Sequence, residues 1–366
     1  MSVKKSEVIR TDLKEISEGI KELYNKISGS TFLIAGGAGF LGRYMVLALD
    51  YLNDQNLLSK PCKIIILDNF ITGLSDWITE KENIKLIRHD ISKPIEIKEE
   101  IDYIVNAASI ASPIFYNKFK LETINVGFLG TKNLLEVAKE KKAKSFLFMS
   151  SSEIYGNPDP KFIPTPEEYL GNVSCVGPRS CYDEPKRIGE ALTVSYADIF
   201  NIPVKIARPF NIFGPGLRLD DGRVMPAFVS AALKGEEIFL YGGGTRTRTF
   251  CYVSNATIGF FKILLSEGKK EIYNIGADDQ EIQIKHLADL IHGLIENSNS
   301  EIHGIEGPSE IYKESDPDRR CPDLTKIRQE LGYNPKVNLI SGLKRFISWA
   351  KEEIEEKHNS ENSKKN

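Results

Sequence analysis

A glycine-rich stretch near the N-terminus constrains the fold of this chain more than any other feature. The apolar residues 31–35 lead into glycines with the spacing G-x-x-G-x-x-G, at Gly36, Gly39 and Gly42, and a helix-like segment follows at 43–52. A buried strand, a tight turn and a helix N-terminus suit a nucleotide pyrophosphate, because glycines let the backbone approach and free N–H groups favour the anion. A strand–helix turn can also need glycine for packing alone.

A second apolar strand candidate at 64–67 ends in Asp68, which is followed by Asn69. A carboxylate at this position accepts hydrogen bonds from a ribose 2′-hydroxyl and repels a 2′-phosphate, so we expect NAD rather than NADP. The alternative is an aspartate that caps a helix or a loop. The order of strand, glycine turn, helix and acidic strand end favours the dinucleotide site.

Strand-like and helix-like segments alternate through the first 208 residues. This alternation predicts a Rossmann-type, doubly wound α/β fold with a parallel sheet and helices on both faces. The strand candidates are 31–35, 63–67, 84–88, 102–106, 145–149 and 203–207, and helices are expected at 42–53, 121–141 and 183–200.

The ends of the third and fourth strand candidates belong to the same predicted site. Asp90 follows the third strand, where its carboxylate would lie near an adenine. Ala107 and Ala108 follow the fourth strand, and small side chains suit a place where the cofactor backbone passes closely.

Four regions follow from the pattern. Residues 1–29 form an amphipathic helix, with apolar residues at steps of three and four, that we expect to dock on its own domain; a dimer contact is the alternative. The NAD-binding domain is expected at 30–208, with later returns near 250–277. Residues 209–356 are mainly a smaller, interleaved C-terminal lobe for the substrate, and the charged tail at 357–366 is expected to be disordered.

Composition excludes several classes of function. The 366 residues are 41% hydrophobic and 27% charged, and the net charge of -3 does not suggest a nucleic-acid surface. No apolar run is long enough to span a membrane, and the N-terminus lacks a secretory core. The five cysteines form no C-x-x-C pair and the five histidines show no ligand spacing, so we expect reduced thiols in the cytoplasm and no metal site.

Tyr182 and Lys186 form the motif Y-x-x-x-K, which places two side chains on one face of a helix. A phenol is a poor base at neutral pH, but a neighbouring ammonium stabilises its phenolate and so tunes it for proton exchange with a sugar hydroxyl. The motif is common by chance. It becomes specific here because it follows both the glycine fingerprint and the segment 150–153, Ser-Ser-Ser-Glu.

Taken together, the sequence resembles the extended short-chain dehydrogenases/reductases that act on nucleotide sugars. Within that family it is most similar to the UDP-glucuronate decarboxylases. The resemblance covers about 31–345. It is carried by GGAGFLG (36–42), LDNFITG (67–73), HDI (89–91), SSSEIYG (150–156), GPRSCYDEPKR (177–187), ARPFNIFGP (207–215), DGRV (221–224), TRTFCYV (247–253) and DPDRRCPDL (316–324).

The resemblance implies a role for each matching residue. Tyr182 would accept the proton of the sugar 4-hydroxyl, Lys186 would hydrogen-bond the nicotinamide ribose, and Ser151 would hydrogen-bond the sugar oxygen. The implied cofactor residues, besides Tyr182 and Lys186, are Gly36, Gly39, Phe40, Leu41, Gly42, Asp68, Asn69, Asp90, Ile91, Ala107, Ala108 and Asn125. The implied nucleotide-sugar residues are Asn211, Arg223, Tyr241 and Arg248. Family resemblance also implies a homodimer.

Position 152 distinguishes reactions within the family. The resembling 4,6-dehydratases carry an Asp-Glu pair where this chain has Ser152 and Glu153, and ordinary 4-epimerases lack the glutamate as well. Arg320 matches the decarboxylase arginine placed near the substrate carboxylate. The expected reaction oxidises C4, so that the C5 carboxylate becomes a β-keto acid and leaves as carbon dioxide. The alternatives are a 4,6-dehydratase or 4-epimerase, and a silent NAD- and nucleotide-binding scaffold.

Three features depart from the family pattern. Pro185 lies inside the Tyr–Lys motif; the pair is undisturbed if the helix starts at Asp183, but the proline removes a backbone hydrogen bond if it starts near Ser180. Gly216 replaces an arginine that the decarboxylases usually carry, with Arg218 two residues further on. The segment 112–125, expected to line the sugar end of the site, also diverges.

Overall fold

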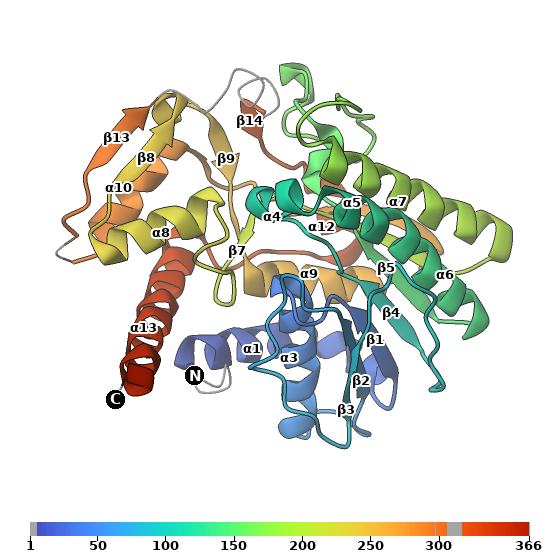
Figure 1. Cartoon of the computed structure of the whole chain (residues 1–366). Coiled ribbons are helices and arrows are strands. Elements are labelled where there is room, and N and C mark those ends of the chain that lie inside the picture. The colour runs from blue at the N-terminus through green and yellow to red at the C-terminus, as the bar shows by residue number, and fades with distance from the viewer. Residues whose placement is uncertain (1–5, 297, 306–316, 366) are drawn as a thin grey trace.

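The computed structural model describes residues 6–296, 298–305 and 317–365. Within them, seven parallel strands form one sheet in the order β11-β6-β5-β4-β1-β2-β3 (Figure 1). The strands are β1 (Thr31–Ala35), β2 (Lys63–Asp68), β3 (Ile84–Arg88), β4 (Tyr103–Asn106), β5 (Ser145–Met149), β6 (Val204–Pro209) and β11 (Lys270–Ile275). The strand order reverses between β1 and β4, and ligands bind beyond the carboxyl ends of strands at such a switch point. The predicted fold class is confirmed.

Strand register brings the predicted cofactor segments to one edge. Ala35, the last residue of β1, is level with Leu67 of β2 and with Asn106 of β4. Three predicted cofactor segments therefore lie side by side at the carboxyl edge of the sheet: the glycine turn, the end of β2 and the small residues after β4.

Two layers of helices cover the sheet, as Figure 1 shows. On one face lie α1 (Glu7–Gly19), α3 (Phe40–Asp54) and α9 (Val253–Leu264), and on the other lie α5 (Lys120–Asn125), α6 (Thr131–Glu140) and α7 (Ser180–Phe200). A separate hydrophobic core lies on each face of the sheet. Alternate residues of β5 point into the two cores, so that Leu147 belongs to one and Phe148 to the other. The helix expected over 121–141 is interrupted by a π-helical turn, η3 (Val126–Gly130).

The N-terminal extension docks on its own domain, as expected. Ile9 and Ile16 of α1 are buried in the core that includes α3 and α9. The single helix expected over 1–29 is instead broken, because α1 ends at Gly19 and is followed by η2 (Lys21–Leu23) and α2 (Tyr24–Ile27). A Cβ on Gly19 would lie 2.6 Å from Ile258 Cδ1, so glycine permits the close approach to α9. Residues 1–5 lie outside the described part.

The smaller lobe lies over the carboxyl edge of the sheet and is interleaved with it, since β11 returns to the main sheet (Figure 1). It contains the helices α8 (Val224–Lys234), α10 (Ile284–Leu294) and α12 (Thr325–Leu331). Its short strands form three small sheets. In one, β9 (Thr247–Thr249) is central and pairs with β12 (Glu281–Gln283) on one side and β14 (Arg319–Arg320) on the other; β13 (Ile302–Ile305) pairs with β8 (Ile238–Tyr241), and β10 (Cys251–Tyr252) pairs with β7 (Ile212–Phe213).

The C-terminal tail differs from the expectation of disorder at 357–366. The helix α13 begins at Leu339 and continues to Lys365. The segment that leads into the tail, 351–357 (KEEIEEK), is rich in lysine and glutamate, which are good helix formers, and the tail continues the helix that this segment forms. Asn366 lies outside the described residues.

Candidate active site

A cavity of about 1110 Å³ lies at the carboxyl edge of the sheet, between the strand ends and the smaller lobe. All five predicted catalytic residues line it, namely Ser151, Glu153, Tyr182, Lys186 and Arg320. The predicted substrate residues Asn211, Arg223, Tyr241 and Arg248 also line it, as do the cofactor residues Gly36, Gly39, Phe40, Leu41, Gly42 and Ala107. Residues far apart in the sequence therefore share one chamber.

Six predicted cofactor residues are not among those that line this cavity: Asp68, Asn69, Asp90, Ala108, Ile91 and Asn125. Ile91 is buried in the core, where a Cβ on Gly130 would lie 2.6 Å from its Cδ1. Asn125 is exposed at the end of α5. Their direct contact with a cofactor stays a prediction.

The glycine turn is packed so tightly that side chains are excluded. A Cβ on Gly36, whose φ is +75°, would lie 2.5 Å from Ala108 Cα, and a Cβ on Gly42 would lie 2.3 Å from the Gly36 carbonyl oxygen. The buried Asp68 carboxylate accepts hydrogen bonds from the backbone N–H groups of Ala38 (3.0 Å) and Phe70 (2.8 Å). The α3 N-terminus has no side-chain cap. These residues fit the diphosphate of a dinucleotide.

Tyr182 and Lys186 both project into the cavity from α7. Lys186 Nζ donates a hydrogen bond of 2.7 Å to the Met149 carbonyl and lies 5.8 Å from the Tyr182 ring centroid. Burial lowers the pKa of Lys186 to about 8. Burial also raises the pKa of Tyr182 to about 12, although a hydrogen bond with Ser151 and the positive charge of Arg223 both act to lower that pKa. At neutral pH Tyr182 is therefore a neutral phenol, whereas Lys186 is still mostly protonated.

The helix that carries this pair begins at Ser180, so Pro185 is inside it. Of the two helix starts considered from the sequence, the structure has the one in which proline removes a backbone hydrogen bond. The Tyr–Lys pair nevertheless lines the cavity, because i and i+4 still share one helix face.

Glu153 is held between two arginines in the wall of the cavity. It follows β5 in η4 (Ser152–Tyr155), and its carboxylate forms a bidentate pair with Arg320, with Nη2 at 2.6 Å from Oε2. Arg179 forms an ion pair with the same carboxylate. Burial would raise the pKa of Glu153, but the two arginines lower it to about 2, so the carboxylate is ionised.

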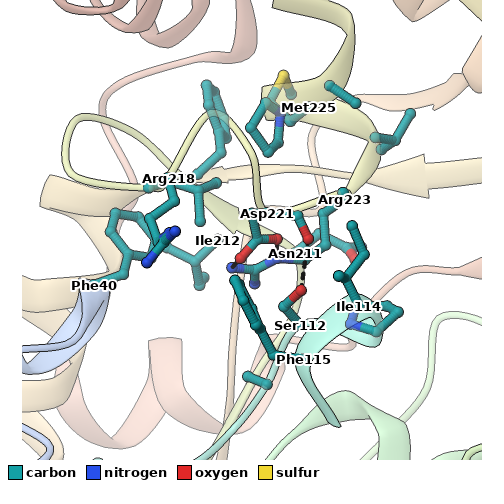
Figure 2. A pocket seen from close by; sticks show the side chains of 18 of the residues that line it. Phe40, Ser112, Ile114, Phe115, Asn211, Ile212, Arg218, Asp221, Arg223 and Met225 are labelled. Carbon is teal, nitrogen blue, oxygen red and sulfur yellow. Dashed lines mark hydrogen bonds and ion pairs between the residues drawn. The ribbon is translucent and has the colours of Figure 1, made fainter. Parts of the chain in front are cut away.

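The loop before α8 brings Arg223 close enough to Tyr182 to act on it electrostatically. Its guanidinium forms an ion pair with Asp221, and Ser112 Oγ donates a 2.5 Å hydrogen bond to the Asp221 carbonyl (Figure 2). The neighbouring predicted substrate residues Asn211 and Arg248 donate to backbone carbonyls, at Thr249 and at Thr247 and Asp318 respectively. Arg223 thus acts electrostatically on Tyr182 as well as lining the chamber.

Three residues near the chemistry were missed from the sequence. Arg179 lies one helical turn before Asp183, a spacing that signals an ion pair within α7. Burial and the nearby Glu153 raise the pKa of Asp183 to about 7. Tyr116, in α4 (Pro113–Lys118), stacks on Tyr182 with ring centroids 5.4 Å apart; only tertiary structure reveals this contact.

In the described part of the chain, no three histidine, cysteine, aspartate or glutamate side chains are grouped as a metal site. Among the helices of these same residues, none is long and apolar enough to cross a membrane. All five cysteines are free thiols.

Comparison with known proteins identifies the family. Residues 32–276 match the NAD dependent epimerase/dehydratase family. UDP-glucuronic acid decarboxylase 5 of Arabidopsis thaliana is 40% identical over 86% of this chain and 88% of its own length. UDP-glucuronic acid decarboxylase 1 of Xenopus tropicalis is 37% identical over 90% of this chain and 74% of its own length.

The fold also matches solved structures. Epimerase Mth375 of Methanothermobacter thermautotrophicus is similar with a TM-score of 0.79 and 26% identity, over 95% of this chain and 98% of that one. The match extends through both the parallel sheet and the smaller lobe. With the glycine turn and the Tyr182–Lys186 pair in one cavity, the chain belongs to the NAD dependent epimerase/dehydratase family.

Proposed function

We propose that this protein is an NAD-dependent decarboxylase of UDP-glucuronate, which forms UDP-xylose or the 4-keto pentose. The observation that carries the proposal is the Glu153–Arg320 pair in the same cavity as Tyr182 and Lys186. A buried guanidinium near the catalytic tyrosine suits a sugar that carries a carboxylate. Ser152 supplies no acid for the elimination of water. The decarboxylase relatives support the same reaction.

In this mechanism Tyr182 acts as a phenolate, which the Lys186 ammonium and the positive charge of an oxidised nicotinamide would stabilise. It takes the proton of the C4 hydroxyl, while Ser151 hydrogen-bonds the same oxygen. Bound NAD would accept the hydride when C4 is oxidised and, in its reduced form, would return the hydride when the 4-ketone is reduced. The 4-ketone makes the C5 carboxylate a β-keto acid, and loss of carbon dioxide leaves the electron pair as an enolate on the C4 oxygen. Tyr182 and Ser151 stabilise that oxygen, an electrostatic effect of the kind that dominates many enzymes.

The ionised state of Glu153 gives it a positioning role in this proposal. Its carboxylate lone pairs are engaged by two arginines and its pKa is about 2, so it is a poor proton donor at neutral pH. It therefore fixes the guanidinium of Arg320 beside the sugar. Asn211, Arg223, Tyr241 and Arg248, which line the lobe side of the cavity, are proposed to bind the nucleotide diphosphate.

Incubation with UDP-glucuronate, followed for carbon dioxide release and for a pentose nucleotide, tests the proposal. Release of carbon dioxide with one pentose product is the expected result. A 4-epimer without carbon dioxide, or a dehydrated product from another nucleotide sugar, would instead indicate one of the sister reactions. A protein that binds NAD and UDP without any turnover would be a scaffold.

The Tyr182→Phe variant tests the assigned chemistry. It removes the phenol but keeps the ring that packs on Tyr116. Turnover should be abolished while NAD binding remains, because the proton acceptor alone is lost. Unaltered activity would remove Tyr182 from the mechanism.

We also propose that the protein is a homodimer. Large apolar side chains are exposed on the adjacent elements α5, η3 and α7, with Leu121 72% exposed. The others are Ile124, Phe128, Leu129, Ile188, Ile199 and Phe200. Such patches commonly mark a protein interface. Analytical ultracentrifugation should find a dimer, and the Leu121→Glu/Phe128→Glu variant should be a monomer; a monomeric parent protein would contradict the proposal.

A cytoplasmic location is proposed as well. It is supported by the five free thiols, since a reducing compartment keeps cysteines unpaired. Fractionation of the source cells would test it, and recovery with secreted or membrane material would argue against it.

A further inference from the structure

Arg43 is a buried cation that the predicted mechanism leaves without a task. It lies in the first turns of α3, is only 6% exposed and lines the cavity. Its Nε has no hydrogen-bond partner. Within residues 6–296, 298–305 and 317–365, its guanidinium makes no ion pair. Its Cζ lies over the Trp77 ring, 5.1 Å from the ring centroid.

A buried guanidinium without a counter-charge is unfavourable, because burial removes its hydration. Burial lowers the pKa of Arg43 to about 10, and the carboxylates of Asp76 and Glu353 oppose this only through space. Arg223 and Arg320 in the same chamber differ in this respect, since each has a carboxylate partner. The position of Arg43 therefore points to an anion that comes from outside the chain.

The position of Arg43 on α3 indicates which anion. Its backbone N–H donates to the Gly39 carbonyl (2.9 Å), so Arg43 lies one turn beyond the N-cap of the helix. Helical side chains lean toward the N-terminus, which directs Arg43 over the turn formed by Gly39 and Phe40. The free N–H groups of that turn, which has no side-chain cap, favour a phosphate at the same place.

The opposite wall of the cavity brings a glycine, and no side chain, next to the guanidinium of Arg43. Gly216, in the loop after β7, faces it, and a Cβ there would lie 3.4 Å from Arg43 Nη1. Gly216 has a φ of +85°, a conformation that side-chain-bearing residues rarely adopt. Because position 216 is glycine, no side chain from this position packs against the guanidinium of Arg43.

We propose that Arg43 binds the diphosphate of the dinucleotide cofactor and so adds a side-chain clamp to the backbone cradle of the glycine turn. The planar guanidinium can engage two phosphate oxygens, as it does at other phosphate sites. The proposal deepens the proposed function, since it takes the dinucleotide of that function as the ligand.

Titration calorimetry of the full chain, freed of bound nucleotide, tests the proposal with three probes: ADP-ribose, adenosine and UDP. Arg43→Met removes the charge but retains an apolar contact for Trp77. We expect its affinity for ADP-ribose to fall about 10- to 100-fold, as for loss of charge-assisted hydrogen bonds. Adenosine and UDP should bind as they do to the parent protein. Arg43→Lys keeps the charge, and its affinity for ADP-ribose should lie between those of the parent protein and Arg43→Met.

Arg328→Met is the matched control. Arg328 is paired with Asp278 outside the cavity, so this variant removes the same charge without touching the site. Its ADP-ribose affinity should equal that of the parent, and only Arg43→Met should weaken the dependence of binding on salt.

Three results would overturn the proposal. The first is an Arg43→Met variant that binds ADP-ribose with the affinity of the parent protein. The second is an equal loss of affinity for ADP-ribose and adenosine, which would show a general disturbance of the nucleotide pocket. The third is a loss of affinity for UDP instead of ADP-ribose. Failure of the parent protein to release carbon dioxide would remove the proposed function, but it would leave the ADP-ribose comparison readable.

Discussion

Pro185 of α7 lies directly against Gly127 of the π-helical turn η3, so closely that a Cβ on Gly127 would be 2.4 Å from Pro185 Cβ. Pro185 is between Tyr182 and Lys186 on the helix that carries the catalytic pair. Its ring replaces a backbone N–H, so the Cys181 carbonyl lacks its usual partner within the helix. The close contact with η3 supports α7 at the point where its own hydrogen bonding is interrupted.

Replacing Gly127 with alanine should therefore disturb the catalytic helix. The added methyl group has no space, so we expect the free energy of unfolding to fall by about 1–3 kcal/mol. Turnover should fall while UDP binding is retained, because α7 would shift. Gly293→Ala is the control, since that helical glycine has nothing within 4 Å of its Cβ position. Chemical denaturation of both variants provides the measurement; equal stability would contradict the packing argument.

Arg320→Met should abolish decarboxylation specifically. The variant leaves Glu153 paired with Arg179, so the local charge remains compensated, but it removes the guanidinium proposed to face the substrate carboxylate. Carbon dioxide release should drop by a factor on the order of 100, as for loss of a buried charge contact of about 3 kcal/mol. NAD binding should be unchanged.

The neighbouring Arg319 provides the control for that variant. Its side chain is paired with Glu281 and is largely exposed, and it does not line the cavity. Arg319→Met should release carbon dioxide at nearly the parent rate. Equal loss in the two variants would show that the β14 strand, and not the Arg320 charge, is responsible.

Tyr116 is expected to position Tyr182 through its ring. The two rings are nearly parallel, at 17° between planes, and both are buried. Tyr116→Leu should lower kcat about 10-fold, equivalent to about 1.4 kcal/mol and within the range measured for aromatic pairs. Tyr116→Phe keeps the ring and should retain most of the activity. If both variants behave alike, the stacking does not matter for turnover.

Asp12 should make stability depend on pH. Its buried carboxylate accepts hydrogen bonds from Tyr44 (2.8 Å), Tyr252 (2.9 Å) and Arg345 (3.0 Å), which tie α1 to α3, β10 and α13. Burial raises its pKa from 3.8 to about 7, despite these partners. Between those values the folded protein holds a proton that the unfolded chain has released, so this stabilising contribution is complete below pH 4 and is lost as pH rises through 7.

The Asp12→Asn variant should lack that pH dependence. Relative to the variant, the parent protein should lose up to about 4 kcal/mol of unfolding free energy between pH 4 and pH 8, at about 1.4 kcal/mol per pKa unit. Urea denaturation at several pH values measures the difference. Parallel curves for the two proteins would show that Asp12 is ionised throughout.

The predictions that succeeded from sequence rest on local order. The strand, glycine turn and helix at 31–54 are adjacent in the chain, and the spacing of Tyr182 and Lys186 fixes their shared helix face. The C-terminal helix reaches further than the polar tail indicates, because the tail continues a helix that has already formed over the preceding residues. The break of the N-terminal helix was missed because it depends on the approach of α9 to Gly19.

Sequence by itself determined the parallel sheet, the glycine turn and the shared helix face of Tyr182 and Lys186, since short-range periodicity and the common edge of parallel strands suffice to place them. Tertiary structure alone decided which charges meet. Glu153 and Arg320 are 167 residues apart and meet only because β14 pairs with β9 over the strand ends. The buried position of Arg43 opposite Gly216 has the same origin. Such contacts depend on how distant segments pack, and no spacing along the chain encodes that packing.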